Sequence, residues 1–180
     1  IVGQADRLRI EATVDASGVQ LIDCGVAVAG GLEAGCFLAE VCLAALGSVR
    51  VEMGDVSVWR GPWVTVATDH PCAACMASQY AGWPVSYDDF FAMGSGPMRI
   101  LANVEELQKE LPADESGTAC VGVLESGSEP TDAAIETIRR AVGNVESLHL
   151  LTAPTASLCG TIQVVARSVE TALHKLHDLN

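Results

Sequence analysis

The segment that most limits the possible folds is residues 118–125 (TACVGVLE), where apolar side chains occupy nearly every position. A strand that is covered on both of its faces has this composition. Thr131 is placed to cap a helix over residues 132–142, and Gly143 is placed to end it. A further strand is predicted over residues 145–151. This strand–helix–strand succession predicts an α/β layer in the second half of the chain.

Residues 152–177 predict a loop followed by one amphipathic helix that starts near Gly160. The apolar side of this helix is Ile162, Val165, Ala166, Val169, Ala172, Leu173 and Leu176. The polar side is Gln163, Arg167, Glu170, His174 and His177, which recur at steps of three and four residues and so share one stripe. The stripe fits a row of functional side chains on the wall of a cleft. It also fits an ordinary exposed face with an Arg–Glu pair, and the spacing leaves both interpretations open.

The first half of the chain predicts hairpins and short helices. Residues 7–14 alternate between apolar and polar, and residues 19–23 can pair back on them after a turn. A helix is predicted from Glu33 to Leu46 with Gly47 as its C-cap. Further strands are predicted over residues 49–53, 56–59 and 63–67, and further helices over residues 72–80 and 97–111. We therefore predict a first α/β lobe with a hairpin start, residues 1–112, and a second α/β segment, residues 113–180.

Charge and hydropathy exclude two classes of partner. The net charge is −13, from 23 acidic and 10 basic residues, whereas binding to nucleic acid or to an anionic membrane requires clustered Lys and Arg. The longest apolar stretch, residues 26–46, is interrupted by Glu33 and Glu40, so no bilayer-spanning segment is expected. An acidic protein suits a cationic small substrate. The seven cysteines are an odd number within apolar segments, which favours reduced thiols and a cytoplasmic protein.

Residues 70–75 (HPCAAC) contain the Pro-Cys-x-x-Cys half of a zinc deaminase signature. That chemistry also needs a His or Cys two residues before a catalytic Glu, and residues 25–69 contain no such pair. A zinc-dependent deaminase that uses Cys72 and Cys75 is therefore the less favoured alternative. Two small residues packed in a helix explain the same pattern.

In residues 94–99 (GSGPMR), the two glycines precede a predicted helix that starts near Pro97. Backbone N–H groups at such a turn can face an anion or a polar ligand, and Arg99 lies one turn further on. The segment lacks the third glycine of a dinucleotide fingerprint and the Lys-Ser/Thr of a P-loop. Taken alone, it indicates a polar ligand without identifying one.

Three groups of residues together resemble methenyltetrahydromethanopterin cyclohydrolases. The first is residues 23–25 (DCG) with 30–35 (GGLEAG), and the second is residues 79–83 (QYAGW) with 91–99 (FAMGSGPMR). The third is residues 153–157 (APTAS) with 163–171 (QVVARSVET). The resemblance covers nearly the whole chain. The family chain continues well beyond this point, and the present chain starts without methionine, so we expect it to be incomplete at its C-terminus.

The resemblance implies an α/β fold with mixed sheets, helices packed on them and two lobes around a central pocket. It implies reversible hydrolysis of N5,N10-methenyltetrahydromethanopterin to the N5-formyl compound in one-carbon metabolism. The pterin is itself the carbon carrier, so no metal and no redox cofactor are expected. Subunits of the family associate, and a homo-oligomer (trimer or dimer) is therefore expected.

The family match assigns roles to named residues. Glu170 is the expected general base and acid, and Arg167 is expected to keep Glu170 ionised and to orient water or the formyl oxygen. The expected substrate-binding residues are Gly94, Ser95, Gly96, Arg99, Thr155, Ser157 and Gln163. A non-catalytic pterin-binding or assembly subunit is the alternative from another functional class.

Overall fold

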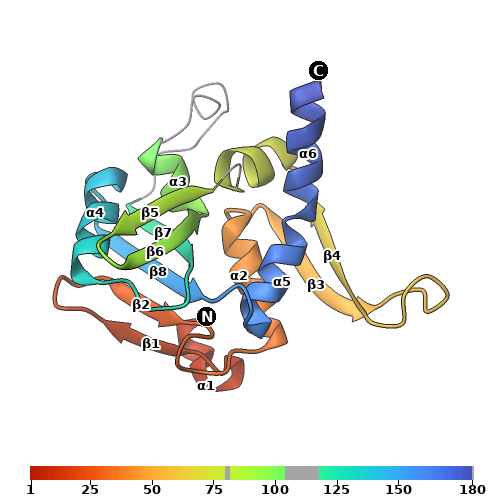
Figure 1. The fold of residues 1–180 in the computed structure, drawn as a ribbon, viewed down its shortest axis with the longest axis horizontal. Helices are drawn as coiled ribbons and strands as arrows, with labels where there is room; N and C mark the ends of the chain where they lie inside the picture. The colour runs from red at the N-terminus through yellow and green to blue at the C-terminus, as the bar shows by residue number, and fades with distance from the viewer. Residues whose placement is uncertain (80–81, 104–117, 180) are drawn as a thin grey trace.

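A central sheet runs through the computed structural model, which describes residues 1–79, 82–103 and 118–179 (Figure 1). The elements of the first half are η1 (Val2–Gln4), α1 (Ala5–Leu8), β1 (Glu11–Val14), β2 (Gln20–Asp23), α2 (Leu32–Cys42), β3 (Gly47–Met53), β4 (Pro62–Thr68), the π-helix η2 (Cys72–Ala77), β5 (Trp83–Tyr87), β6 (Phe90–Ser95) and α3 (Pro97–Ala102). Those of the second half are β7 (Ala119–Glu125), α4 (Asp132–Val142), β8 (Ser147–Ala153), α5 (Leu158–Ala166) and α6 (Ser168–Leu179). These elements confirm the predicted mixed α/β class.

The large sheet has six strands in the order β1-β2-β8-β7-β6-β5. β8 pairs in parallel with β2 and β7, and the remaining pairs are antiparallel. The predicted apolar strand is therefore central, since β7 lies between β6 and β8 with Cys120, Val123 and Leu124 fully buried. Strands from residues 1–112 and from residues 113–180 share this one sheet. The predicted division into two lobes stays a prediction.

Helices cover both faces of the sheet. Successive strand residues point to opposite faces, so Leu148 and Leu150 of β8 pack with α3 and α4, while Leu151 packs with α1, α2 and α5. A third cluster joins α2, β3, η2 and the end of α5. The hairpin of β3 and β4 extends from the body on the same side as α5 and α6 (Figure 1). None of the helices within the described ranges is long and apolar enough to cross a membrane.

Several local predictions are confirmed. The first hairpin forms with Ala12 opposite Ile22. Helix α4 begins and ends where the sequence predicts, because the Thr131 side chain accepts a hydrogen bond from the Ala134 N–H and Gly143 takes a positive φ of 77°. The predicted helix over residues 97–111 starts at Pro97, and α3 ends before Asn103, which has a φ of 47°. Residues 104–111 of that prediction lie outside the described residues.

Three predictions in the first half are wrong. The first strand does not start at Arg7, because α1 occupies residues 5–8 and Arg9 turns the chain with a φ of 59°. Helix α2 ends at Cys42 instead of Leu46, because Ala44 and Ala45 have positive φ. Gly47 consequently opens β3 and is not a C-cap. Residues 56–58 form a turn and no strand, since the Asp55 carboxylate accepts hydrogen bonds from Ser57.

The predicted single helix from Gly160 to His177 is also wrong. The chain forms α5 and α6 with a break at Arg167, whose ψ is −7°. The Ser168 hydroxyl donates to the Val165 carbonyl at 2.6 Å, a local side-chain bond that competes with continued helix. The Arg167 side chain at this break contacts Glu125 of the sheet.

Gly160 sets how closely α5 approaches the loop before it. A Cβ at this position would lie 2.0 Å from the carbonyl oxygen of Pro154. We expect Gly160→Ala to lower the free energy of unfolding by about 1–3 kcal/mol, because neither backbone segment can move aside freely. Gly127→Ala is the matched control, since a Cβ there meets nothing within 4 Å. Urea unfolding of both variants is the measurement, and equal stabilities would contradict this account of Gly160.

Candidate active site

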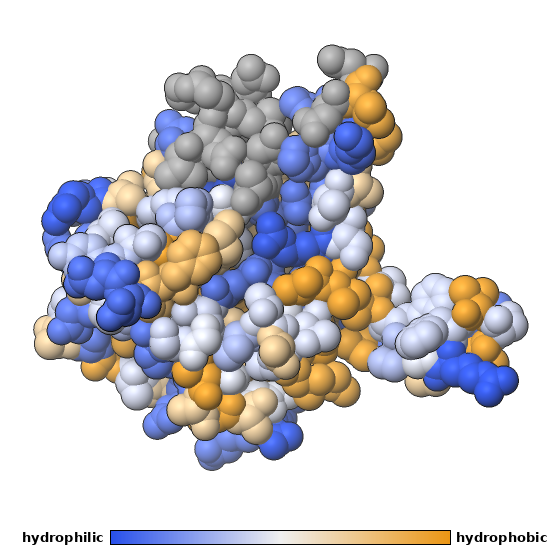
Figure 2. All heavy atoms as spheres, in the orientation of Figure 1, coloured by the Kyte–Doolittle hydropathy of each residue, from blue (hydrophilic) through white to orange (hydrophobic). Residues whose placement is uncertain are grey.

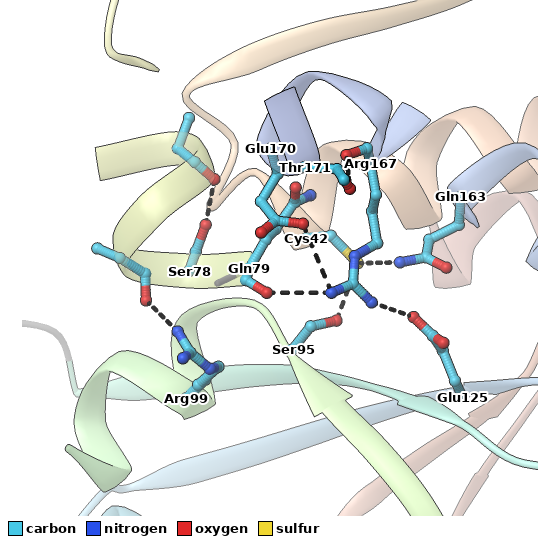
Figure 3. Close-up of polar contacts among 12 residues, drawn as sticks. Cys42, Ser78, Gln79, Ser95, Arg99, Glu125, Gln163, Arg167, Glu170 and Thr171 are labelled. Carbon is cyan, nitrogen blue, oxygen red and sulfur yellow. Dashed lines mark hydrogen bonds and ion pairs between the residues drawn. The ribbon is translucent and has the colours of Figure 1, made fainter. Parts of the chain in front are cut away.

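The side chain of Arg167 joins three parts of the fold (Figure 3). Its Nη1 donates to Oε1 of Glu125, at the end of β7, over 2.8 Å. Its Nη2 donates to the carbonyl oxygen of Gln79, just after η2, over 3.1 Å. The same Nη2 lies 3.8 Å from Oε2 of Glu170, in the first turn of α6. The sheet, η2 and α6 thus meet at one guanidinium group.

These charged groups are mostly shielded from water. The side chains of Arg167, Glu125 and Glu170 are 19%, 11% and 5% exposed. Charges in such a place interact more strongly than they do in bulk water. One guanidinium faces two carboxylates, and the buried Arg99 guanidinium also acts on Glu170.

Glu170 has a raised pKa in this environment. Burial raises the pKa of its carboxyl, and nearby Arg167, His174 and Arg99 lower it without cancelling the effect of burial. The sequence predicted instead that Arg167 would simply keep Glu170 ionised. Arg167 acts in the predicted direction, since it lowers the pKa of Glu170, but burial has the larger effect.

The polar stripe lies partly inside the protein. Gln163 is fully buried, and Glu170 is 4% exposed, whereas His177 is exposed. The amide nitrogen of Gln163 donates to Sγ of Cys42 over 3.4 Å, and its amide oxygen has no hydrogen-bond partner among the described residues. For Gln163, Arg167 and Glu170, the exposed-face interpretation is therefore wrong, and the cleft-wall interpretation stays a prediction. Figure 2 shows a recess with hydrophilic walls in the middle of the same face of the molecule.

Of the predicted GSGPMR binding segment, Ser95 is linked to Gln163 of the stripe through Cys42. Ser95 is 1% exposed at the end of β6, and its hydroxyl lies 3.2 Å from Sγ of Cys42. Burial raises the pKa of the Cys42 thiol to about 11, so the thiol stays protonated at neutral pH. Ser95, Cys42 and Gln163 form a chain of contacts from the sheet to α5 (Figure 3).

The other residues of the segment take part in the strand, the turn and the helix around them. Gly94 belongs to β6, and Gly96 turns the chain into α3 with a φ of 84°. Arg99 is fully buried and donates from Nη1 to the carbonyl oxygen of Ala77 over 2.9 Å, which ties α3 to the end of η2. Their roles in substrate binding stay predictions.

Thr155 and Ser157 lie at the opposite end of α5 from Arg167. Ser157 caps that helix, since its Oγ accepts from the Gly160 N–H over 3.0 Å and donates to the Pro154 carbonyl over 2.7 Å. Thr155 is exposed. The nine residues of α5 rise by about 13 Å, so the structure does not bring these hydroxyls to the guanidinium. Their binding role stays a prediction, for a part of a ligand remote from Glu170.

The sequence did not single out Glu125 or Gln79 as site residues. Glu125 had one available signal, because it is a charged residue that closes an otherwise apolar central strand. Ligands of α/β sheets gather at such strand ends. Gln79 contributes its backbone carbonyl, which no side-chain pattern reveals. Within the part of the chain that the structure describes, both polar atoms of its buried side-chain amide lack a hydrogen-bond partner.

The Cys72–Cys75 pair does not form part of a metal-ligand cluster in the described ranges. Cys72 is exposed and Cys75 is buried. Among residues 1–79, 82–103 and 118–179, no three His, Cys, Asp or Glu side chains are grouped so as to hold a metal ion. The third ligand that a zinc deaminase requires is therefore missing from the described part of the chain.

Comparison with known proteins gives one family. Residues 1–180 match the family model described as Cyclohydrolase (MCH). The chain is 44% identical to the methenyltetrahydromethanopterin cyclohydrolase of Methylobacillus flagellatus over 100% of this chain and 55% of the relative. The proteins of the same name from Rhodopirellula baltica and Methanococcoides burtonii are 46% and 41% identical, over 91% and 96% of this chain and 50% and 54% of theirs. The chain spans about half the length of these relatives.

Proposed function

The chain belongs to the cyclohydrolase (MCH) family, and on that basis we propose that it hydrolyses the methenyl bridge of N5,N10-methenyltetrahydromethanopterin. The observation that carries this proposal is the buried Glu170 carboxylate beside the Arg167 guanidinium, which Glu125 and Gln79 hold in place. The family supplies the reaction, and this geometry supplies a group that can move the protons.

The reaction needs one proton acceptor that later becomes a donor. The bridge carbon is an amidinium carbon bonded to N5 and N10. Water adds to this carbon, and the Glu170 carboxylate takes a proton from the water. The bond from carbon to N10 then breaks, N10 receives a proton from Glu170, and the carbon stays on N5 as a formyl group. One methenyl cation and one water thus give the N5-formyl compound and one released proton.

Arg167 and the surrounding charges support this sequence of steps. The guanidinium can donate hydrogen bonds to the attacking water or to the forming formyl oxygen. The raised pKa of Glu170 is nearer to neutral pH than the pKa of an ordinary glutamate. This suits a group that must both accept and return a proton. The ionised Glu170 carboxylate attracts the cationic methenyl group of the substrate more strongly than the uncharged formyl group of the product.

The predicted binding residues divide by their place relative to Arg167 and Glu170. Gln163 belongs to the same stripe, and its amide oxygen can accept a hydrogen bond from the pterin edge. Ser95 and its neighbours Gly94, Gly96 and Arg99 shape the wall beneath it. Thr155 and Ser157 would meet the remote tail of the substrate, one helix length away.

Three further parts of the proposal rest on the resemblance alone. They are a reaction without metal or redox cofactor, association of copies into a homo-oligomer, and a cytoplasmic location. Sedimentation of the purified chain would measure the association. Hydrolysis that continues unchanged in the presence of a metal chelator would support the absence of a metal.

The test is to mix the purified chain with N5,N10-methenyltetrahydromethanopterin and to follow the methenyl absorbance and the product mass. We expect the absorbance to fall and the N5-formyl compound to appear. Substrate that binds but stays unchanged would replace this proposal with the second candidate, a pterin-binding or assembly subunit.

A further inference from the structure

We propose that Glu125 is a positioning residue that neutralises part of the Arg167 charge and thereby sets the proton affinity of Glu170. The inference deepens the proposed function and rests on it for its kinetic consequences. Its electrostatic content can be measured without turnover.

The two carboxylates use different nitrogens of one guanidinium. Glu125 binds Nη1 at 2.8 Å, and Glu170 lies 3.8 Å from Nη2. Both can therefore be held at the same time, as Figure 3 shows. The ion pair with Glu125 is the shorter one, so the sheet holds the guanidinium more closely than α6 does.

The backbone of Glu125 is held by strand pairing on both sides. It is the last residue of β7 and lies opposite Met93 of β6 on one side and Ala153 of β8 on the other. Arg167, by contrast, sits at the break between two helices. A carboxylate on a rigid central strand thus determines where the guanidinium lies.

The charges of Arg167 and Glu125 act on Glu170 in opposite directions. A guanidinium beside a carboxylate lowers the pKa of that carboxyl. A second carboxylate on the same guanidinium opposes this effect, because the two anions repel each other across it. In the structure, burial is a larger influence on the pKa of Glu170 than Arg167 is. Without the charge of Glu125, the full charge of Arg167 would act on Glu170.

The other charged groups around Glu170 are accounted for. Arg167 and His174 lie on or next to its own helix, Arg99 faces it from α3, and the Cys75 thiol faces it from η2. All four remain when Glu125 is changed. A changed titration of Glu170 would therefore report the charge of Glu125.

The experiment is a pH titration of Glu170 in protein that carries ¹³C-labelled glutamate side chains, followed by the carboxyl carbon signal. Glu170→Gln identifies the signal by its loss. In Glu125→Gln the amide oxygen can still accept from Nη1, but the charge is gone. We expect the midpoint of Glu170 to fall by about one pH unit. Glu136→Gln on α4 is the matched control, since Glu136 is exposed, and it should leave the midpoint unchanged.

A second readout comes from kinetics. If the chain turns over the substrate, the acidic limb of the pH profile of kcat/KM should shift to lower pH by the same amount in Glu125→Gln. The reason is that Glu170 must be ionised to act as a base. A merely structural role for Glu125 would lower kcat at all pH values and leave the limb in place. Absence of turnover in the wild-type chain would count against the proposed function and would leave the titration to decide this inference.

A folded Glu125→Gln variant with the wild-type midpoint would overturn the inference. If that variant does not fold, Glu125→Asp takes its place, because it keeps the charge and moves it back by one methylene group. We then expect a smaller fall in the midpoint. An unchanged or raised midpoint in Glu125→Asp would overturn the inference equally.

Discussion

Glu170→Gln should lower kcat by roughly a hundred- to ten-thousand-fold, the range that general acid–base catalysis contributes. The amide has nearly the same shape as the carboxylate but cannot take a proton from water at neutral pH. Substrate binding should persist, since Arg167 remains bound to Glu125 and Gln79. Steady-state hydrolysis of the methenyl compound measures the loss. Glu136→Gln on the exposed side of α4 is the control and should keep full activity.

The same variant should not unfold the protein. The pKa of Glu170 is raised in the folded state, so its contribution to stability is fully present below the unfolded pKa and is lost as pH rises through the folded pKa. Glutamine does not ionise and escapes this loss. At pH 7 the thermal midpoint of Glu170→Gln should therefore equal or exceed that of the wild type. Near-wild-type activity in a folded variant would refute the role of Glu170.

Arg167→Lys should lower kcat/KM by about 10²–10³-fold, comparable to removal of one preorganised donor from an active site. Lysine keeps the positive charge but is a single point. It cannot reproduce a planar group that contacts Glu125 from one nitrogen and Gln79 from another. A variant with wild-type kcat/KM would show that charge alone is sufficient and that the fork geometry is not needed.

Arg167→Ala should in addition destabilise the fold by roughly 3 kcal/mol, because Glu125 and Glu170 would stay buried without their cation. Arg140→Ala is the matched control. Its pair with Glu136 is largely exposed, so the change should cost less than about 1 kcal/mol. Urea unfolding of both variants separates the buried from the exposed pair, and equal losses would contradict the buried-network account.

Much of the fold follows from local sequence signals. The apolar composition of residues 118–125 predicted a central strand, and Thr131 with Gly143 predicted both ends of α4. These signals work because burial on both faces and helix capping depend on the residues of the segment itself. The three-residue step from Arg167 to Glu170 likewise placed the two side chains together before any tertiary contact was known.

The rest depends on contacts between distant segments. The break between α5 and α6 was missed, because apolar periodicity continues across Arg167. Glu125 was missed as a site residue, since its pairing with Arg167 bridges 42 positions in the sequence. The end of α2 at Cys42 was missed for a different reason, because alanine gives no warning of the positive φ at Ala44 and Ala45.

The most direct test of the catalytic centre is a single-turnover experiment with the chain in excess over N5,N10-methenyltetrahydromethanopterin. The methenyl absorbance is recorded for the wild type and for Glu170→Gln side by side, together with the fraction of substrate bound. We predict that the wild type converts the bound substrate and that Glu170→Gln binds it with its absorbance intact. Equal rates of loss in the two proteins would contradict the assignment of Glu170 as the proton-transferring group.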